Sequence, residues 1–221
     1  MAEFTLYIGD KAYSSWSLRG WLACRLAGID FDEVLIRMYQ SDTAATMRRH
    51  SPSSKVPALH HRDLVIWESL AIGEYLAELV PAAGLWPAER ARRAHARSIS
   101  CEMHAGFTNV RKSMWMNLRR RFPGRGRNPE TLADIARVSE IWCDTRQRFG
   151  AGGPFLFGDK FSLADAMYAP VVARFVTWEP PLADDAKTYV EAVWSHPLVA
   201  EWRRAAEADP ILIDHYETPG P

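Results

Sequence analysis

The sequence contains few cysteines, no long apolar run and no excess of charge of either sign, and each absence excludes a class of protein. Its three cysteines (Cys24, Cys101 and Cys143) lie far apart and form no C-x-x-C motif, which argues against a disulfide scaffold and a dithiol redox centre. No apolar run approaches the length of a membrane span. Lys plus Arg and Asp plus Glu each number 27, so no net field favours nucleic acid or a membrane as partner.

The opening stretch MAEFTLYIGD also lacks the basic segment and long apolar core of a signal peptide. We therefore expect a cytoplasmic protein whose cysteines stay reduced. What the sequence does contain is 48% hydrophobic and 24% charged residues, with nine Trp, over 221 positions. This composition is typical of a compact globular chain, long enough for one large domain or two small ones.

The first eighty residues alternate between strand and helix patterns. Apolar runs at 4–8 and 31–38 predict strands, and apolar residues at helical spacing from 15 predict a helix that Gly28 ends. We then expect a weak helix at 42–50, a hairpin of strands at 58–61 and 64–67, and a helix over 70–79. The order β-α-β-α-β-β-α predicts an α/β domain whose first two strands are parallel.

Beyond a segment rich in Pro, Gly and Ala the pattern becomes helical. Apolar residues at helical spacing predict one helix through 99–118, a second over 132–149 and a last one over 198–208. Ser162 precedes Asp165 by three residues, a capping box that begins a helix at Leu163. We interpret this pair as structural. We therefore expect the first domain to span residues 1–80, a linker residues 81–88 and an all-helical domain residues 89–221.

Four motifs occur in an order and at a spacing that resemble the cytosolic glutathione S-transferases. They are SSWSLR at 14–19, KVPAL at 55–59, ESLAIGEYL at 68–76 and SLADAMYAP at 162–170. The resemblance covers essentially the whole chain and implies a thioredoxin-like, glutathione-binding N-terminal domain followed by a helical C-terminal domain. The spacing of Ser14 and Arg19 is most similar to the serine-type zeta and tau classes.

In this family the reacting thiol belongs to glutathione, and the resemblance implies that Ser14 activates it. A free thiol has a pKa of roughly 8.5, and only its thiolate attacks electrophiles well. A helix N-terminus with a hydroxyl donor stabilises the thiolate. Ser15 is the alternative donor, with Ser17 and Tyr13 less favoured, and local sequence alone also fits serines that only cap the helix.

Other residues are suited to the carboxylates, the ammonium group and the peptide backbone of glutathione. The implied glutathione-binding residues are Ser15, Trp16, Lys55, Val56, Pro57, Glu68 and Ser69. Lys55 suits the glycyl carboxylate, and a cis bond before Pro57 would present the backbone of Val56 to the cysteinyl residue. Ser69 suits the γ-glutamyl carboxylate, because anions bind at helix N-termini, and Glu68 suits the ammonium group. Each of these residues also has an ordinary structural interpretation as a cap or a solvated charge.

We expect the second substrate between the two domains. Candidate lining residues are Tyr13, Trp16, Met103, Phe107, Met114, Trp115 and Arg174. Arg174 could bind a substrate carboxylate, although its distance from Asp165 differs by about a turn from the zeta pattern. Zeta enzymes carry the motif SSCS where this chain has SSWS, so that Trp16 stands in place of the cysteine. Because this position lies beside the reacting thiol, the difference weakens a specific assignment as maleylacetoacetate isomerase.

The resemblance therefore implies a detoxifying glutathione transferase that conjugates the thiolate to small apolar electrophiles. The resemblance implies a homodimer. The alternatives are a glutathione-dependent isomerase, peroxidase or dehalogenase, or a non-catalytic binding module of the same fold. We expect glutathione as co-substrate and no metal, because His60 and His61 point to opposite faces of a strand and Cys101 with His104 has no further ligand. The arginines between 119 and 127 are interpreted as a solvated helix end.

Overall fold

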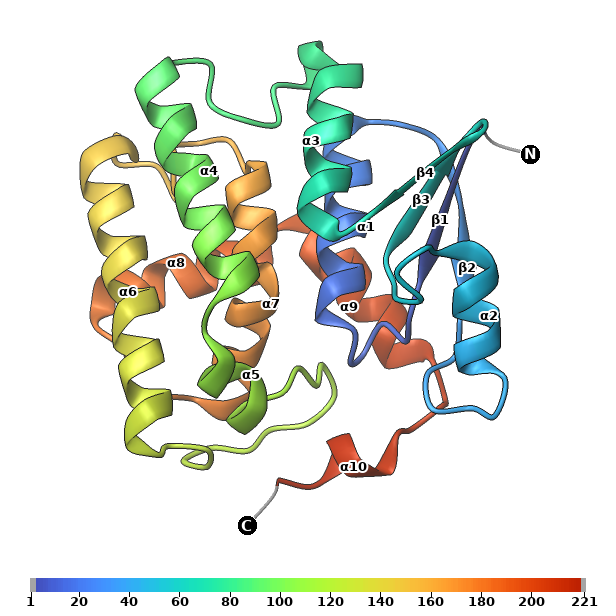
Figure 1. The fold of residues 1–221 in the computed structure, drawn as a ribbon. Coiled ribbons are helices and arrows are strands. Elements are labelled where there is room, and N and C mark those ends of the chain that lie inside the picture. The colour runs from blue at the N-terminus through green and yellow to red at the C-terminus, as the bar shows by residue number, and fades with distance from the viewer. Residues whose placement is uncertain (1–2, 220–221) are drawn as a thin grey trace.

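The computed structural model describes residues 3–219, and its N-terminal third is a four-stranded sheet flanked by helices (Figure 1). The elements are β1 (Phe4–Ile8), α1 (Ser15–Ala27), β2 (Phe31–Leu35), α2 (Thr43–His50), β3 (Ala58–His61), β4 (Leu64–Trp67) and α3 (Ser69–Leu79). The predicted order of strands and helices is confirmed. The second strand ends at Leu35, three residues earlier than expected.

The sheet has the strand order β2-β1-β3-β4. β1 pairs with β2 in parallel and with β3 antiparallel, and β3 and β4 form the hairpin. Alternate residues of β1 (Phe4, Leu6 and Ile8) are buried in the core, as expected for a strand with one face covered. His60 and His61 lie against different neighbours, the rings of Tyr7 and Phe4. Over residues 3–219 there is no group of three or more His, Cys, Asp or Glu that could hold a metal ion.

The rest of the described chain is helical, as predicted. It contains the short 3₁₀ turn η1 (Pro81–Ala83), then α4 (Arg90–Ala105), α5 (Thr108–Ser113), α6 (Pro129–Phe149), α7 (Leu163–Trp178), α8 (Asp184–Ser195), α9 (Pro197–Ala208) and α10 (Asp214–Glu217). No helix in the described part of the chain is long and apolar enough to cross a membrane.

The prediction of one helix through 99–118 is wrong. α4 ends at Ala105 with Gly106 as its C-cap, and Phe107 adopts the left-handed conformation with φ of 59° before α5 begins. After α5 the chain is extended, and the backbone N–H of Leu118 donates to the carbonyl of Ala12. The apolar spacing continues through the break because Met103 before it and Val110 after it are both buried core residues.

α7 is the helix that joins the two halves. All but one of its residues are buried, and it packs against α1 as well as α4 and α8. α3 also approaches closely, since a Cβ on Gly73 would lie 2.5 Å from Leu163 Cδ2. The capping box begins α7 as predicted, with the backbone N–H of Ser162 donating to Asp165 Oδ2 at 2.8 Å.

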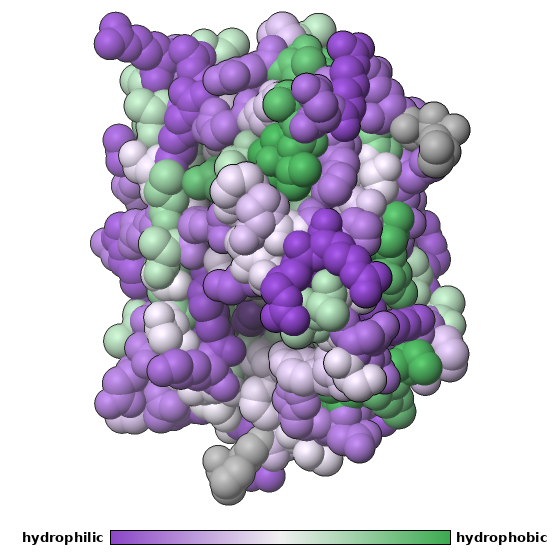
Figure 2. All heavy atoms as spheres, turned by 45° about the vertical axis from the view of Figure 1, so that its right-hand side comes forward, coloured by the Kyte–Doolittle hydropathy of each residue, from purple (hydrophilic) through white to green (hydrophobic). Residues whose placement is uncertain are grey.

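The C-terminal segment (residues 209–218) returns to the N-terminal half, and α10 lies below both halves in Figure 1. Arg119 donates to the carbonyls of Ala206 and Ile211, and Arg120 pairs with Glu217 at 2.6 Å. The interpretation of these two arginines as a solvated helix end is therefore wrong, because they hold this segment in place. The face shown in Figure 2 is mainly hydrophilic, with separate apolar patches.

Candidate active site

Five of the predicted site residues line one cavity of about 320 Å³ between the sheet end and α4. Its lining residues are Trp16, Ser53, Lys55, Val56, Pro57, Glu68, His104 and Ala105. Three separate segments of the N-terminal half therefore meet here, as the motif analysis predicted. His104 and Ala105, which the sequence analysis did not place in the site, come from the helical half.

The N-terminus of α1 is formed by a turn and a cluster of serines. The backbone N–H of Ser14 donates to the carbonyl of Asp10 at 2.8 Å, and Ser14 is the N-cap residue. Its Oγ lies 2.7 Å from Ser17 Oγ, which accepts from the backbone N–H of Gly9 at 2.9 Å. Ser14 and Ser17 are both buried. Either hydroxyl can donate in the Ser14–Ser17 pair. When Ser17 donates, the Ser14 proton is free for an acceptor beyond it.

Ser15 has a different partner, the predicted residue Arg174. Arg174 Nη2 donates to Ser15 Oγ at 3.2 Å, and Nη1 donates to the carbonyl of Pro170 at 3.2 Å. Burial, with the nearby charge of Arg111, lowers the pKa of Arg174 to about 9. Ser15 also keeps a proton for an acceptor, so the structure leaves both serines as candidate thiolate donors.

Two arginines, Arg19 and Arg111, lie against the ring of Trp16, and a third, Arg174, interacts electrostatically with both. We call these three residues the arginine cluster. The guanidinium carbons of Arg19 and Arg111 lie 4.8 Å and 4.9 Å from the Trp16 ring centroid. Arg19 is fully buried, with Nε donating to the carbonyl of Met167 at 2.8 Å. Burial and the other two guanidinium groups hold its pKa well below the usual range. Such a concentration of buried positive charge favours an anion.

Several nitrogens of the arginine cluster have no hydrogen-bond partner among residues 3–219. They are Nη1 and Nη2 of Arg19, Nη1 of Arg111 and Nε of Arg174. Unpaired buried donors are costly, and a bound carboxylate would satisfy them. The sequence analysis missed Arg111 because its place depends on the break at Phe107, which brings α5 back toward α1.

The opposite wall is built by the loop before β3 and by the start of α3. The Val56–Pro57 peptide bond is cis, as expected. Glu68 stands before α3 with φ of 69°, a conformation that is uncommon for a non-glycine residue. Ser69 Oγ is buried and has no partner in the described part of the chain. A free hydroxyl and the first N–H groups of α3 thus point to an anionic ligand.

The remaining second-substrate candidates do not line this cavity. The Tyr13 hydroxyl donates to Glu217 at 2.6 Å, and burial together with this carboxylate raises its pKa to about 12. Trp115 lines a separate cavity of about 340 Å³ with Trp178. Met103 is fully buried and Phe107 nearly so. Their assignment to a second-substrate pocket stays a prediction.

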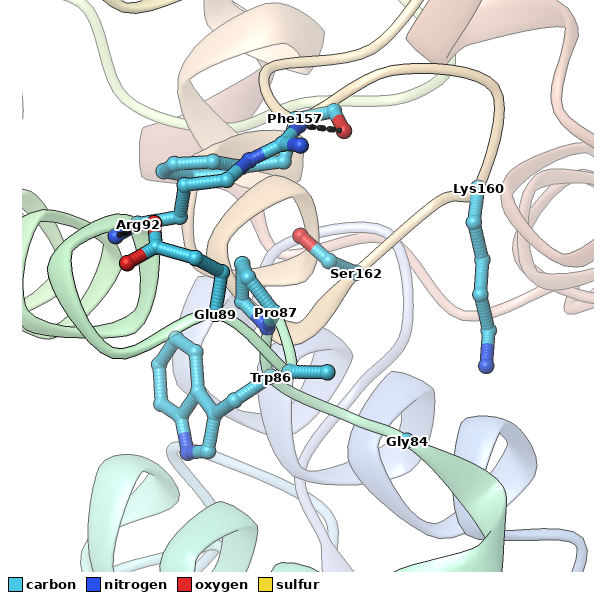
Figure 3. A pocket seen from close by; sticks show the side chains of 9 residues that line it. Gly84, Trp86, Pro87, Glu89, Arg92, Phe157, Lys160 and Ser162 are labelled. Carbon is cyan, nitrogen blue, oxygen red and sulfur yellow. Dashed lines mark hydrogen bonds between the residues drawn. The ribbon is translucent and has the colours of Figure 1, made fainter. Parts of the chain in front are cut away.

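A larger cavity of about 440 Å³ lies beside the segment that joins α3 to α4 (Figure 3). Each of its charged side chains has at least one hydrogen-bond partner within the chain. Arg92 donates to the carbonyl of Phe157 at 2.7 Å, the bond drawn in Figure 3, and Lys160 donates to the carbonyl of Ala83. Glu89 accepts from two backbone N–H groups at the start of α4. No predicted glutathione contact lies there, so the smaller cavity is the better candidate.

Comparison with known proteins identifies the family of this chain. Residues 13–79 match the model of the glutathione S-transferase N-terminal domain, and residues 128–216 match that of the C-terminal domain. Glutathione S-transferase 1 of Dianthus caryophyllus is 32% identical over 184 residues, covering 79% of this chain and 78% of the relative. The chain therefore belongs to the glutathione S-transferase family.

Two further likenesses bear on the site. A probable maleylacetoacetate isomerase of Caenorhabditis elegans is 26% identical over 170 residues, covering 76% of each chain. A glutathione transferase homolog from Burkholderia gl BGR1, solved with bound glutathione, has a TM-score of 0.70 at 23% identity. It matches over 93% of this chain and 99% of its own. This last likeness supports the fold.

Proposed function

We propose that this member of the glutathione S-transferase family binds glutathione in the cavity beside α1 and transfers its thiolate to an electrophile. The observation that carries the proposal is the convergence of Lys55, Glu68 and the cis Val56–Pro57 bond on one cavity. Glutathione offers an anion, a cation and a strand-like backbone that match these groups. The bound glutathione in the Burkholderia homolog supports the same occupant.

In this arrangement the γ-glutamyl end lies at the start of α3 and the glycyl end near Lys55. Ser69 Oγ and the α3 N-terminus take the γ-glutamyl carboxylate, and Glu68 takes the ammonium group. The backbone of Val56 pairs with the cysteinyl residue, which directs the sulfur toward the N-terminus of α1. These are the contacts that the sequence motifs predict.

Ser14 is our assignment for the donor to the thiolate. In this role Ser17 accepts from the backbone N–H of Gly9 and donates to Ser14 Oγ, so that Ser14 donates its own proton to sulfur. A hydrogen bond to a charged group contributes about 1.5–3 kcal/mol, which corresponds to lowering the thiol pKa by about one to two units. Ser15 takes this role instead if the sulfur lies on the Arg174 side.

The arginine cluster favours a second candidate function, in which the electrophile carries a carboxylate. Arg19, Arg111 and Arg174 present unpaired buried donors near Ser15 and Trp16. An acidic substrate would be attracted there, and an isomerase of the maleylacetoacetate type is one such case. The likeness to a probable maleylacetoacetate isomerase supports it. Conjugation to small apolar electrophiles stays the first candidate.

We also propose a cytoplasmic homodimer. Edge strand β4 and the end of α3 expose the apolar side chains of Leu64, Trp67 and Leu79, and a second copy of the chain would cover them. Light scattering on the purified protein should give a molar mass twice that of one chain. The Trp67→Glu variant should give a mass closer to that of one chain. A monomeric wild type would contradict the dimer.

Glutathione affinity capture followed by turnover assays tests the main proposal. The wild-type chain should be retained on immobilised glutathione and released by free glutathione. It should then conjugate at least one member of a panel of neutral and carboxylate-bearing electrophiles. A chain that does not bind glutathione would exclude the enzyme interpretation. Binding without turnover would favour the non-catalytic module.

A further inference from the structure

His104 reaches from α4 of the helical half into the proposed glutathione cavity. It lines the cavity with Lys55 and Glu68, and its Nε2 lies 3.5 Å from Glu68 Oε2. Its ring also contacts the edge of Trp16, with centroids 5.1 Å apart. A group that titrates near neutral pH therefore faces the carboxylate assigned to the ammonium group of glutathione.

The charges around His104 come from three elements besides its own. Glu68 stands at the start of α3, Arg19 lies on α1 and Arg111 on α5. Burial lowers the pKa of His104, and the charges of Arg19 and Arg111 lower it further, whereas Glu68 acts in the opposite direction. Lys55, on the loop before β3, is the other cationic residue that lines the cavity. The imidazole is therefore mainly neutral at pH 7 and gains a proton only as the pH falls below the ordinary pKa of histidine.

We propose that His104 competes with the ammonium group of glutathione for the carboxylate of Glu68, so that glutathione affinity falls in acid. This inference rests on the proposed function, because the proposed function assigns Glu68 to the ammonium group of glutathione. A neutral imidazole leaves the Glu68 charge available to the ligand. An imidazolium pairs with Glu68 and repels the incoming ammonium, since both carry positive charge.

The direction follows from proton linkage. If the ligand binds better to the form with neutral His104, binding releases a proton, and affinity decreases as the pH falls through the pKa of His104. For a single group this decrease is at most tenfold per pH unit. The buried Nδ1 of His104 has no partner among residues 3–219, so no second acceptor holds the proton there.

Calorimetric binding of S-methylglutathione between about pH 5.5 and 7.5 tests the proposal. This ligand has no thiol, so its pH dependence does not report thiol ionisation. We expect wild-type affinity to weaken toward the acidic end, by at most about tenfold per pH unit. His104→Gln keeps a hydrogen-bond donor without titrating, and its affinity should not change over this range. The N-acetylated ligand, which lacks the ammonium group, should likewise lose the dependence.

His95→Gln is the matched control. His95 lies on the same helix, has a pKa lowered by burial, and bonds to Thr145 Oγ1 at 2.9 Å away from the cavity. This variant should keep the wild-type pH dependence. A wild-type affinity that does not change with pH, or a His104→Gln variant that keeps the dependence, overturns the role of His104 while leaving the proposed function intact. Absence of binding at every pH overturns both.

Discussion

Replacing Ser14 with alanine removes the proposed donor to the glutathione thiolate. The lost hydrogen bond contributes about 1.5–3 kcal/mol, so the pKa of the bound thiol should rise by about one to two units. Because Ser14 is buried, water does not readily replace the hydroxyl. Below the thiol pKa the thiolate fraction, and with it kcat/KM, should fall about 10- to 100-fold. The Kd for glutathione should change little, because the peptide contacts remain.

The assay is the pH profile of kcat/KM, together with ultraviolet difference spectra that detect the bound thiolate. Ser14 also caps α1, so the variant should lose about 1 kcal/mol of stability. Asn128→Ala controls for this loss, because Asn128 caps α6 by accepting from the backbone N–H of Thr131 at 2.8 Å. It should lower the Tm without moving the thiol pKa. An unchanged thiol pKa in Ser14→Ala, with a raised pKa in Ser15→Ala, would refute the assignment.

Three further predictions concern residues around the site. Arg174→Gln should raise KM about tenfold or more for a carboxylate-bearing electrophile and leave a neutral one unaffected, because it removes a buried charged donor; equal effects on both would contradict the anion-binding role. Gly20→Ala should lower the Tm, because its Cβ would lie 2.8 Å from Pro57 Cγ and overpacking costs about 1–3 kcal/mol. Tyr13→Phe should keep kcat/KM within about twofold at pH 7, because the hydroxyl donates to Glu217; a large loss would identify Tyr13 as the thiol donor.

Local pattern predicted the N-terminal half well. Alternation between short apolar runs and helical spacing was sufficient for β1 through α3, because each element buries one face that its own residues define. The motif around Pro57 and the motif that begins at Glu68 predicted one wall of the cavity. These residues act through backbone geometry and helix ends, which are local properties.

Features that depend on contacts between distant segments could not be predicted. Apolar spacing continues across Phe107, so periodicity gave no indication of the break between α4 and α5. That break determines where Arg111 lies. Nothing in the sequence indicated that His104 contacts Glu68, because Glu68 is 36 residues earlier in the chain. The contact between Tyr13 and Glu217 joins the two ends of the described chain.

A crystal structure of the chain with glutathione tests the central proposal most directly. We predict that the sulfur lies within hydrogen-bond distance of Ser14 Oγ, that the γ-glutamyl group contacts Glu68 and Ser69, and that the glycyl carboxylate lies near Lys55. Glutathione bound in another cavity, or with its sulfur directed away from the N-terminus of α1, would contradict the proposed mechanism.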